Sequence, residues 1–126
     1  MDIDKLKQAR KWTQDELESC VNFWLKNGMD HENGGVYTCL DRYGKVYSTD
    51  KSVWMQGRCA WTFAYLCNTY GPKQEWIDAA KSCIDFLEKY CKNPYAQNRL
   101  YFTVTKDGKP LRQRRYFFSE AFYYES

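Results

Sequence analysis

The sequence predicts an all-α fold in which outer and inner helices form concentric layers, a toroid, with β-hairpins between them. One stretch recurs at a fixed offset of 64 residues (108 − 44 = 64), which pairs Tyr37 with Tyr101 and Gly44 with Gly108. Such a fixed period is typical of repeat architectures. In addition, amphipathic helical patterns alternate with a pattern that is apolar on almost all sides, as expected for alternating surface and buried helices.

The first unit opens with an amphipathic helix that Asn27-Gly28 is expected to end. Thr13 and Glu16 fit a capping box and therefore predict a break or a new start within this helix. Residues 36–40 and 45–49 then flank a glycine-containing turn, which is the pattern of a β-hairpin. The apolar positions of the helix are Leu6, Ala9, Leu17, Val21, Trp24 and Leu25.

A second helix is predicted over residues 53–70, with Ser52 as its cap and Gly71-Pro72 at its end. Because it is apolar almost all round, it is expected to be an inner helix, buried on most sides. The helix predicted over residues 74–92 instead has one apolar stripe opposite a charged face, which is typical of a surface helix.

A second hairpin is predicted over residues 100–113, with Asp107-Gly108 at its turn. Phe117 then begins another apolar helix, which continues to Ser126 without glycine, proline or a polar tail. Termini are usually exposed and polar. We therefore interpret residues 1–126 as a single unit, the N-terminal part of a larger ring that is truncated within an inner helix.

Composition excludes several classes of protein. The chain has 126 residues, an 18% aromatic fraction and a net charge of +3 from acidic and basic residues that are mixed along it. Its one basic cluster, residues 112–115, is too short to predict nucleic-acid binding. His31 is the only histidine and none of the six cysteines forms a Cys-x-x-Cys pair, so no metal site is predicted. No apolar stretch predicts a membrane span or a signal peptide, and the expected location is cytoplasmic.

Arg58 is the most informative single residue, because it lies within the apolar helix predicted over residues 53–70. Trp54 at i−4 and Trp61 at i+3 share its face, and a buried guanidinium must find an anion or several acceptors. Two interpretations remain open. Arg58 either binds the oxygen atoms of a sugar between tryptophan rings or pairs with a carboxylate such as Glu120.

Other residues near Arg58 are candidates on weaker grounds. Glu120 follows Gln56 by 64 residues (120 − 56 = 64), so the two occupy equivalent places on successive inner helices. Gly57 predicts a close approach of another helix or of a ligand. Trp54 and Trp61 fit the core more often than a ligand platform. The His31 loop, residues 30–35, lacks the ligand pattern of a calcium site and is expected to be structural.

These motifs resemble the N-acylglucosamine 2-epimerase family, whose members are also described as renin-binding proteins. The resemblance follows the order of the family's motifs along essentially the whole chain, including residues 31–35, 41–44, 107–110 and 118–123. Its most specific part is Val53-Trp54-Met55-Gln56-Gly57-Arg58.

The resemblance implies an (α/α)6 barrel, of which this chain covers roughly the first third. It implies an enzyme that interconverts N-acetylglucosamine and N-acetylmannosamine, with ATP as an activator that is not consumed and a homodimer as the full-length form. The alternatives are another sugar 2-epimerase or isomerase of the same barrel class, or a fragment that binds sugars or proteins without catalysis.

The resemblance also implies roles for individual residues. Epimerisation at C2 needs a base, an acid and donors that stabilise an enolate oxygen. Arg58 matches the family's cavity-lining arginine and is expected to stabilise the enolate and the sugar oxygens. Trp54, Gln56 and Glu120 are expected to face the same sugar cavity. The proton-transfer histidines of the family lie on later inner helices and are absent from this chain.

Overall fold

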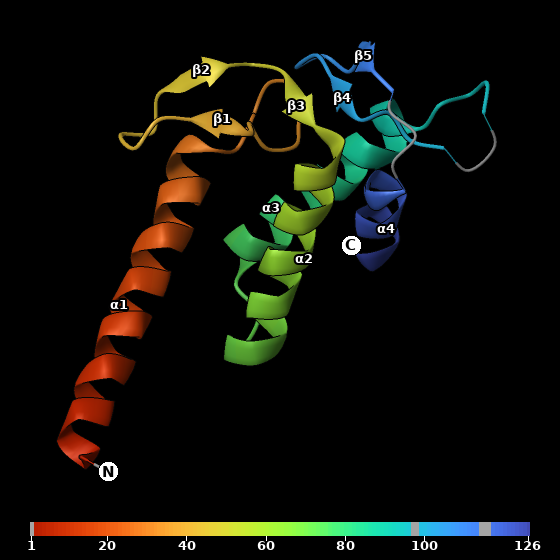
Figure 1. Ribbon diagram of the computed structural model, residues 1–126. Helices are drawn as coiled ribbons and strands as arrows, with labels where there is room; N and C mark the ends of the chain where they lie inside the picture. Colours follow the sequence, from red (N-terminus) through yellow and green to blue (C-terminus); the bar gives the residue numbers. More distant parts are fainter. Residues whose placement is uncertain (1, 97–98, 114–116) are drawn as a thin grey trace.

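A computed structural model describes residues 2–96, 99–113 and 117–126. Its helices stand roughly side by side, and its short strands gather at one end of them (Figure 1). The elements in chain order are α1 (Ile3–Asn27), β1 (Cys39–Leu40), β2 (Val46–Ser48), β3 (Lys51–Ser52), α2 (Val53–Tyr70), α3 (Gln74–Phe86), a π-helical turn η1 (Leu87–Cys91), β4 (Thr103–Val104), β5 (Pro110–Arg112) and α4 (Phe118–Glu125).

Helix α1 is continuous, so the predicted break at Thr13 is wrong. The Thr13 hydroxyl donates to the carbonyl oxygens of Ala9 (3.0 Å) and Arg10 (2.8 Å) within the helix, a pattern that lets threonine sit inside a helix. The actual N-cap is Asp2, whose carboxylate accepts from the backbone N–H groups of Asp4 and Lys5. The N-terminal half of α1 projects away from the other helices (Figure 1).

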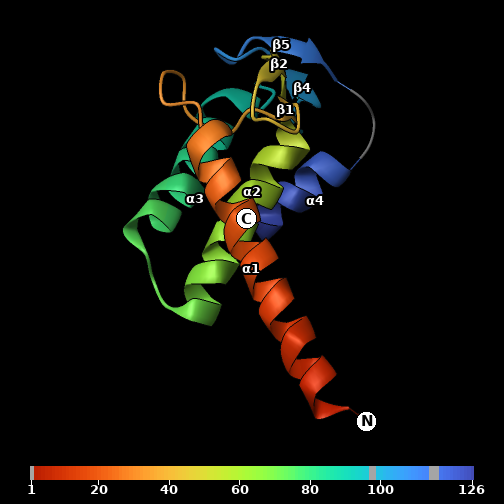
Figure 2. The same cartoon turned by 90° about the vertical axis from the view of Figure 1, so that its left-hand side faces the viewer.

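Helix α2 has the predicted bounds and lies between α3 and α4 (Figure 2). Phe63 and Leu66 of α2 pack against Trp76 and Ala79 of α3 in one apolar cluster. The expectation that α2 is buried on most sides is wrong for the face of α2 that contacts neither α3 nor α4. On this face Tyr65 is 53% exposed. The reason is geometric, since α3 and α4 cover only part of the helix.

Helix α3 and η1 together cover the predicted segment, but the helix widens into a π-turn at Leu87. The apolar stripe is buried as predicted, apart from Ile84, which is half-buried, and Ile77, which is 41% exposed. Cys83 and Cys91 lie in this stripe, and all six cysteines are free thiols. Burial raises the pKa of Cys91 to about 12, so this thiol behaves as a small apolar side chain.

Both predicted hairpins form, and they confirm the internal repeat. The Asp41 N–H donates to the carbonyl of Lys45 (2.9 Å), and the Thr105 N–H donates to that of Lys109 (2.8 Å). Gly44 and Gly108 have the same positive φ of 88°, which glycine adopts without strain. Strand β3 was not predicted. It pairs with β4 and so joins the start of α2 to the second hairpin.

Gly44 and Gly108 provide a matched test of this turn. A Cβ added at Gly44 would lie 2.4 Å from the amide carbon of Asn27, whose Nδ2 atom donates to the Phe23 carbonyl (2.9 Å). One added at Gly108 would lie 2.2 Å from the ring of Tyr90 and 2.7 Å from its Cβ. Because the Asn27 amide can turn away at the loss of that hydrogen bond, we expect Gly44→Ala to cost about 1–2 kcal/mol for the positive φ and about 1 kcal/mol for the lost bond. Gly108→Ala should cost a further 1–3 kcal/mol or so from the clash. Equal urea midpoints for the two variants would contradict the packing seen at Tyr90.

Candidate functional site

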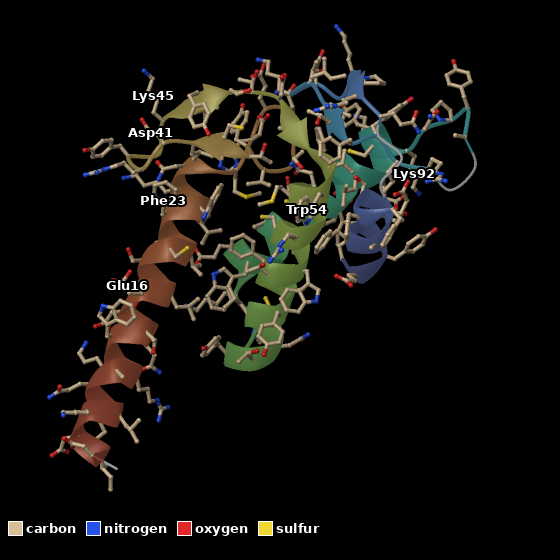
Figure 3. The ribbon with its side chains drawn as sticks, viewed as in Figure 1. Glu16, Phe23, Asp41, Lys45, Trp54 and Lys92 are labelled. Carbon is tan, nitrogen blue, oxygen red and sulfur yellow. The ribbon has the colours of Figure 1, made fainter. Side chains whose placement is uncertain are left out.

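Three aromatic rings join α2 to α4 near the end of the helices where the strands lie. Figure 3 labels Trp54 in the first turn of α2, on the side that faces α4. Its ring stacks on Phe122 with a centroid separation of 5.2 Å and on Phe118 with one of 6.4 Å. Such offset stacks stabilise a contact beyond the area that they bury, so α4 is held against α2 by a ring contact.

Gly57 allows this contact to be close. A Cβ at this position would lie 2.4 Å from the backbone oxygen of Phe122 and 2.8 Å from its carbonyl carbon, distances that real Cβ atoms do not adopt. The predicted close approach is confirmed, and what approaches is a helix. Gly57 thereby places the backbone of α4 directly beside the next residue of α2, Arg58.

Arg58 is exposed, so the expectation of a buried guanidinium is wrong. Its Cζ atom lies 5.4 Å from the centroid of the Phe122 ring, within the range of a cation–π contact. No carboxylate among the described residues lies within ion-pair distance of it, and the alternative in which Arg58 pairs with Glu120 is not realised. The donors of the guanidinium are therefore free of an anionic partner within the described chain.

Arg58 also lines a mostly apolar groove of about 240 Å³ between α1 and α2. The groove runs from the first hairpin loop toward the middle of α2. Its walls include Trp24, Val36, Met55, Thr62 and Phe63. The guanidinium thus lies where an aromatic contact on one side meets an apolar groove on the other.

Glu120 is half-buried at the start of α4. Its Oε1 atom accepts a hydrogen bond from the backbone N–H of Leu100 (3.1 Å). Its Oε2 atom is buried and has no hydrogen-bond partner among the described residues. One oxygen of Glu120 therefore fixes the segment that leads into the second hairpin, and the other keeps its acceptor capacity.

Gln56 is fully buried, in contrast to the expectation that it faces a sugar cavity. Its Oε1 accepts from the N–H of Val36 (2.8 Å), and its Nε2 donates to the carbonyl of Val36 (2.7 Å). These two bonds satisfy both ends of the amide and hold the first hairpin loop on α2. We therefore assign Gln56 a structural role.

The sequence favours a place in the core for Trp61 over a role as a ligand platform. In the structure, however, the Trp61 side chain is 48% exposed. Its ring stacks on Tyr65 at 5.0 Å with an angle of 13° between the ring planes. The structure therefore places Trp54 and Trp61 differently. Trp54 is committed to the contact with α4, whereas Trp61 belongs to an exposed pair of rings on α2.

A buried ion pair was missed by the sequence analysis. The Lys51 ammonium donates to Asp30 Oδ2 (2.7 Å), to the carbonyl of Gly34 (2.7 Å) and to that of Lys106 (3.2 Å). The side chains of Lys51 and Asp30 are 0% and 1% exposed. Three acceptors satisfy the three donors of the ammonium, which makes this burial tolerable.

Asp30 also organises the loop that contains His31. Its Oδ1 accepts from the backbone N–H groups of Glu32 and Asn33, each at 3.0 Å. His31 itself is exposed. The loop is therefore an Asx-type turn tied to a lysine, in agreement with the structural role that was expected. Nothing in the polar stretch around Lys51 marks it as a buried residue, because its partners are distant in sequence.

This pair gives a pH dependence of stability. Burial by itself raises the pKa of the Asp30 carboxyl. The hydrogen bonds from Lys51 and Asn33 lower this pKa by more than burial raises it, so that the net change is from 3.8 to about 2. Because the pKa is lower in the folded state, the stabilisation is present above pH 3.8 and is lost as the pH falls toward 2. It amounts to about 2 kcal/mol.

Unfolding free energies measured across this acid window should fall more steeply for the wild type than for Asp30→Asn. Asp85→Asn, which removes an exposed carboxylate paired with Lys81, is the control and should keep the wild-type slope. Parallel curves for the wild type and Asp30→Asn would contradict the assignment of the acid sensitivity to this pair.

Within the described part of the chain, no cluster of three or more His, Cys, Asp or Glu side chains is placed to hold a metal ion. The helices in that part are all too short or too polar to cross a bilayer.

Comparison with known proteins identifies relatives along most of the chain. Residues 35–124 match the family model described as N-acylglucosamine 2-epimerase (GlcNAc 2-epimerase). The N-acylglucosamine 2-epimerase of Mus musculus is 36% identical over 122 residues, which are 95% of this chain and 29% of that protein. That of Rattus norvegicus is 40% identical over 110 residues, 86% of this chain and 26% of that protein. The chain thus spans less than a third of the length of these curated relatives.

Solved structures show the same likeness. The structure of cellobiose 2-epimerase from Spirochaeta thermophila DSM 6192 matches 94% of this chain and 29% of its own, with a TM-score of 0.81 and 26% identity. A crystal structure of D-mannose isomerase matches with a TM-score of 0.69 at 14% identity, which concerns the fold alone.

Proposed function

Since the chain belongs to the N-acylglucosamine 2-epimerase family, we propose that the whole protein that carries it interconverts N-acetylglucosamine and N-acetylmannosamine at C2. The observation that carries the proposal is Arg58, an exposed guanidinium without a carboxylate partner in the described chain, at the contact of α2 with α4. It lies within the stretch that most specifically resembles the family.

The chemistry explains why such a group is needed. Removal of the C2 proton from the open-chain aldehyde leaves negative charge on the carbonyl oxygen. A fixed guanidinium stabilises that charge more in the transition state than in the ground state, which is the condition for catalysis. Glu120 Oε2, a buried acceptor without a described partner, suits a sugar hydroxyl. Trp54 contributes by holding the Phe122 ring, which borders Arg58.

We propose that the proton-transfer groups lie outside these 126 residues, since the one histidine of the chain is His31 in the exposed loop. The 126-residue chain alone is then inactive. We further propose that its helices form the first third of an (α/α)6 barrel, and that the whole protein is a cytoplasmic homodimer.

ATP as a non-consumed activator remains a proposal for the whole protein. The described residues contain no glycine-rich loop that leads into a helix N-terminus, the arrangement that commonly cradles phosphates.

Deuterium incorporation tests the function directly. The whole protein is incubated with N-acetylglucosamine in D₂O, and the C2 proton is followed by NMR. Loss of the C2 proton signal together with the appearance of N-acetylmannosamine is expected, because proton abstraction and return exchange that position with solvent. Turnover of neither N-acyl sugar, with or without ATP, would overturn the proposal.

A second substrate is favoured by one comparison, the TM-score of 0.81 to a cellobiose 2-epimerase. Cellobiose and mannose therefore belong in the same assay. A higher kcat/KM on either sugar than on N-acetylglucosamine would assign the protein to another sugar 2-epimerase or isomerase of this fold. Binding of sugars without exchange at C2 would instead favour a non-enzymatic role.

A further inference from the structure

The ring of Phe122 is in contact with two candidate site residues of α2. It stacks on Trp54 at 5.2 Å, and the Arg58 guanidinium carbon lies 5.4 Å from its centroid. Trp54 and Arg58 are one helical turn apart (58 − 54 = 4), so both side chains lie on the same side of α2. A single ring from α4 thus connects two residues that the sequence analysis selected on α2.

The position of this ring is itself fixed. The absence of a side chain at Gly57 lets the Phe122 backbone contact α2 directly. One residue later, the Tyr123 hydroxyl donates to the Glu88 carboxylate of η1, and Lys92 pairs with the same carboxylate. Contacts on both sides of α4 therefore hold the Phe122 ring where it meets Arg58.

Arg58 needs such a support. An arginine side chain has several rotatable bonds and loses considerable conformational entropy when it is held in one geometry. No ion pair in the described chain restrains it. Among the described residues, the π face of Phe122 attracts the guanidinium and leaves its N–H donors free for a ligand.

We propose that Phe122 is a positioning residue, whose ring orients the Arg58 guanidinium toward the oxygen that becomes negative during epimerisation. The inference rests on the proposed function for its kinetic consequence. It adds a residue on α4 that acts through Arg58 without touching the substrate. A carboxylate in this place would fix Arg58 equally well but would neutralise the charge that the reaction needs.

Phe122→Leu in the whole protein tests the inference, with Phe118→Leu as the matched control. Phe118 stacks on Trp54 from the same helix at 6.4 Å, whereas the described ring contact of Arg58 is with Phe122. We expect Phe122→Leu to lower kcat about tenfold with little change in KM, because the misplaced donor is used chiefly in the transition state. Phe118→Leu should keep kcat within about twofold, because the described ring contact of Arg58 is kept in this variant.

Two further readouts separate positioning from packing. Replacing Phe122 by phenylalanines with one, two and three ring fluorines keeps the shape and weakens the π face step by step, so kcat should fall in the same order. Phe122→Tyr, which keeps an aromatic face, should retain most of the activity. In the Arg58→Ala background, Phe122→Leu should have almost no additional effect on kcat.

The outcomes are distinct for the inference and for the function. Equal kcat values for Phe122→Leu, Phe118→Leu and the wild type, or additive losses with Arg58→Ala, would overturn the positioning role while the epimerase activity stands. If the wild type shows no exchange at C2, the proposed function fails. The contact is then tested by the ring-current shift of the Arg58 Nε–H signal, which should disappear in Phe122→Leu and persist in Phe118→Leu. A shift that persists in Phe122→Leu would overturn the inference.

Discussion

Replacing Arg58 by alanine is expected to lower kcat of the whole protein by about two to three orders of magnitude, the range seen when a transition-state donor is removed. The physical reason is that the guanidinium stabilises charge that develops only as the C2 proton leaves. The loss should appear in kcat and in kcat/KM alike. Steady-state assays with N-acetylglucosamine, together with C2 exchange in D₂O, measure it.

The fold should tolerate this change. Arg58 is exposed, and its described aromatic contact is to Phe122, so the unfolding midpoint of Arg58→Ala should stay close to that of the wild type. Arg58→Lys is an informative comparison, because it keeps the charge but loses the planar fork of donors. Near-normal turnover by Arg58→Ala would remove Arg58 from the site and with it the main support for the proposed mechanism.

Lys51→Met is expected to be the most destabilising single substitution among those considered, at about 3–5 kcal/mol. Methionine fills a similar volume but leaves the carboxylate of Asp30 buried and without its cation. It also removes the donors to the carbonyls of Gly34 and Lys106. Urea unfolding of the whole protein, followed by tryptophan fluorescence, measures the change.

Lys81→Met serves as the control for Lys51→Met. Lys81 pairs with Asp85 at the surface, where the two side chains are 68% and 62% exposed, and pairs of this kind contribute little. The midpoint of Lys81→Met should therefore be nearly unchanged. In the Lys51→Met background, Asp30→Asn should restore part of the lost stability by removing the unpaired charge. A stable Lys51→Met single variant would show that the pair is not a structural requirement.

The local features of the fold could be predicted from the sequence because their signals are local. Ser52 before α2 and Gly71-Pro72 after it indicated the correct bounds, although the Ser52 side chain makes no capping hydrogen bond to the helix. The glycines of the two hairpin turns indicated the repeat. Thr13 misled because its hydroxyl can bond either to a helix N-terminus or to the carbonyls of the preceding turn. Only the three-dimensional context decides between these two arrangements.

The candidate site was only partly predictable, for a different reason. Trp54 and Arg58 are neighbours on one helix, so their spacing placed them together. Their connection through Phe122 depends on how α4 packs, which no spacing within α2 contains. The role of Gln56 was missed for the same reason. The amide of a glutamine in an apolar helix can hydrogen-bond either a ligand or the protein backbone, and the sequence does not show that its partner is the backbone of Val36. Lys51 was missed altogether, since its acceptors are far away in sequence.

Strand β3 has a consequence for the order in which the chain assembles. It pairs Lys51 with Val104, 53 positions apart (104 − 51 = 53), and so belongs to the first unit while completing the sheet of the second. In arrays whose repeats contact only through adjacent faces, folding can start in any unit and spread. Here the first unit lacks part of its pairing until the second has been synthesised. We therefore expect the two units to gain stability together, and nascent chains that end before β4 to be incompletely folded on the ribosome.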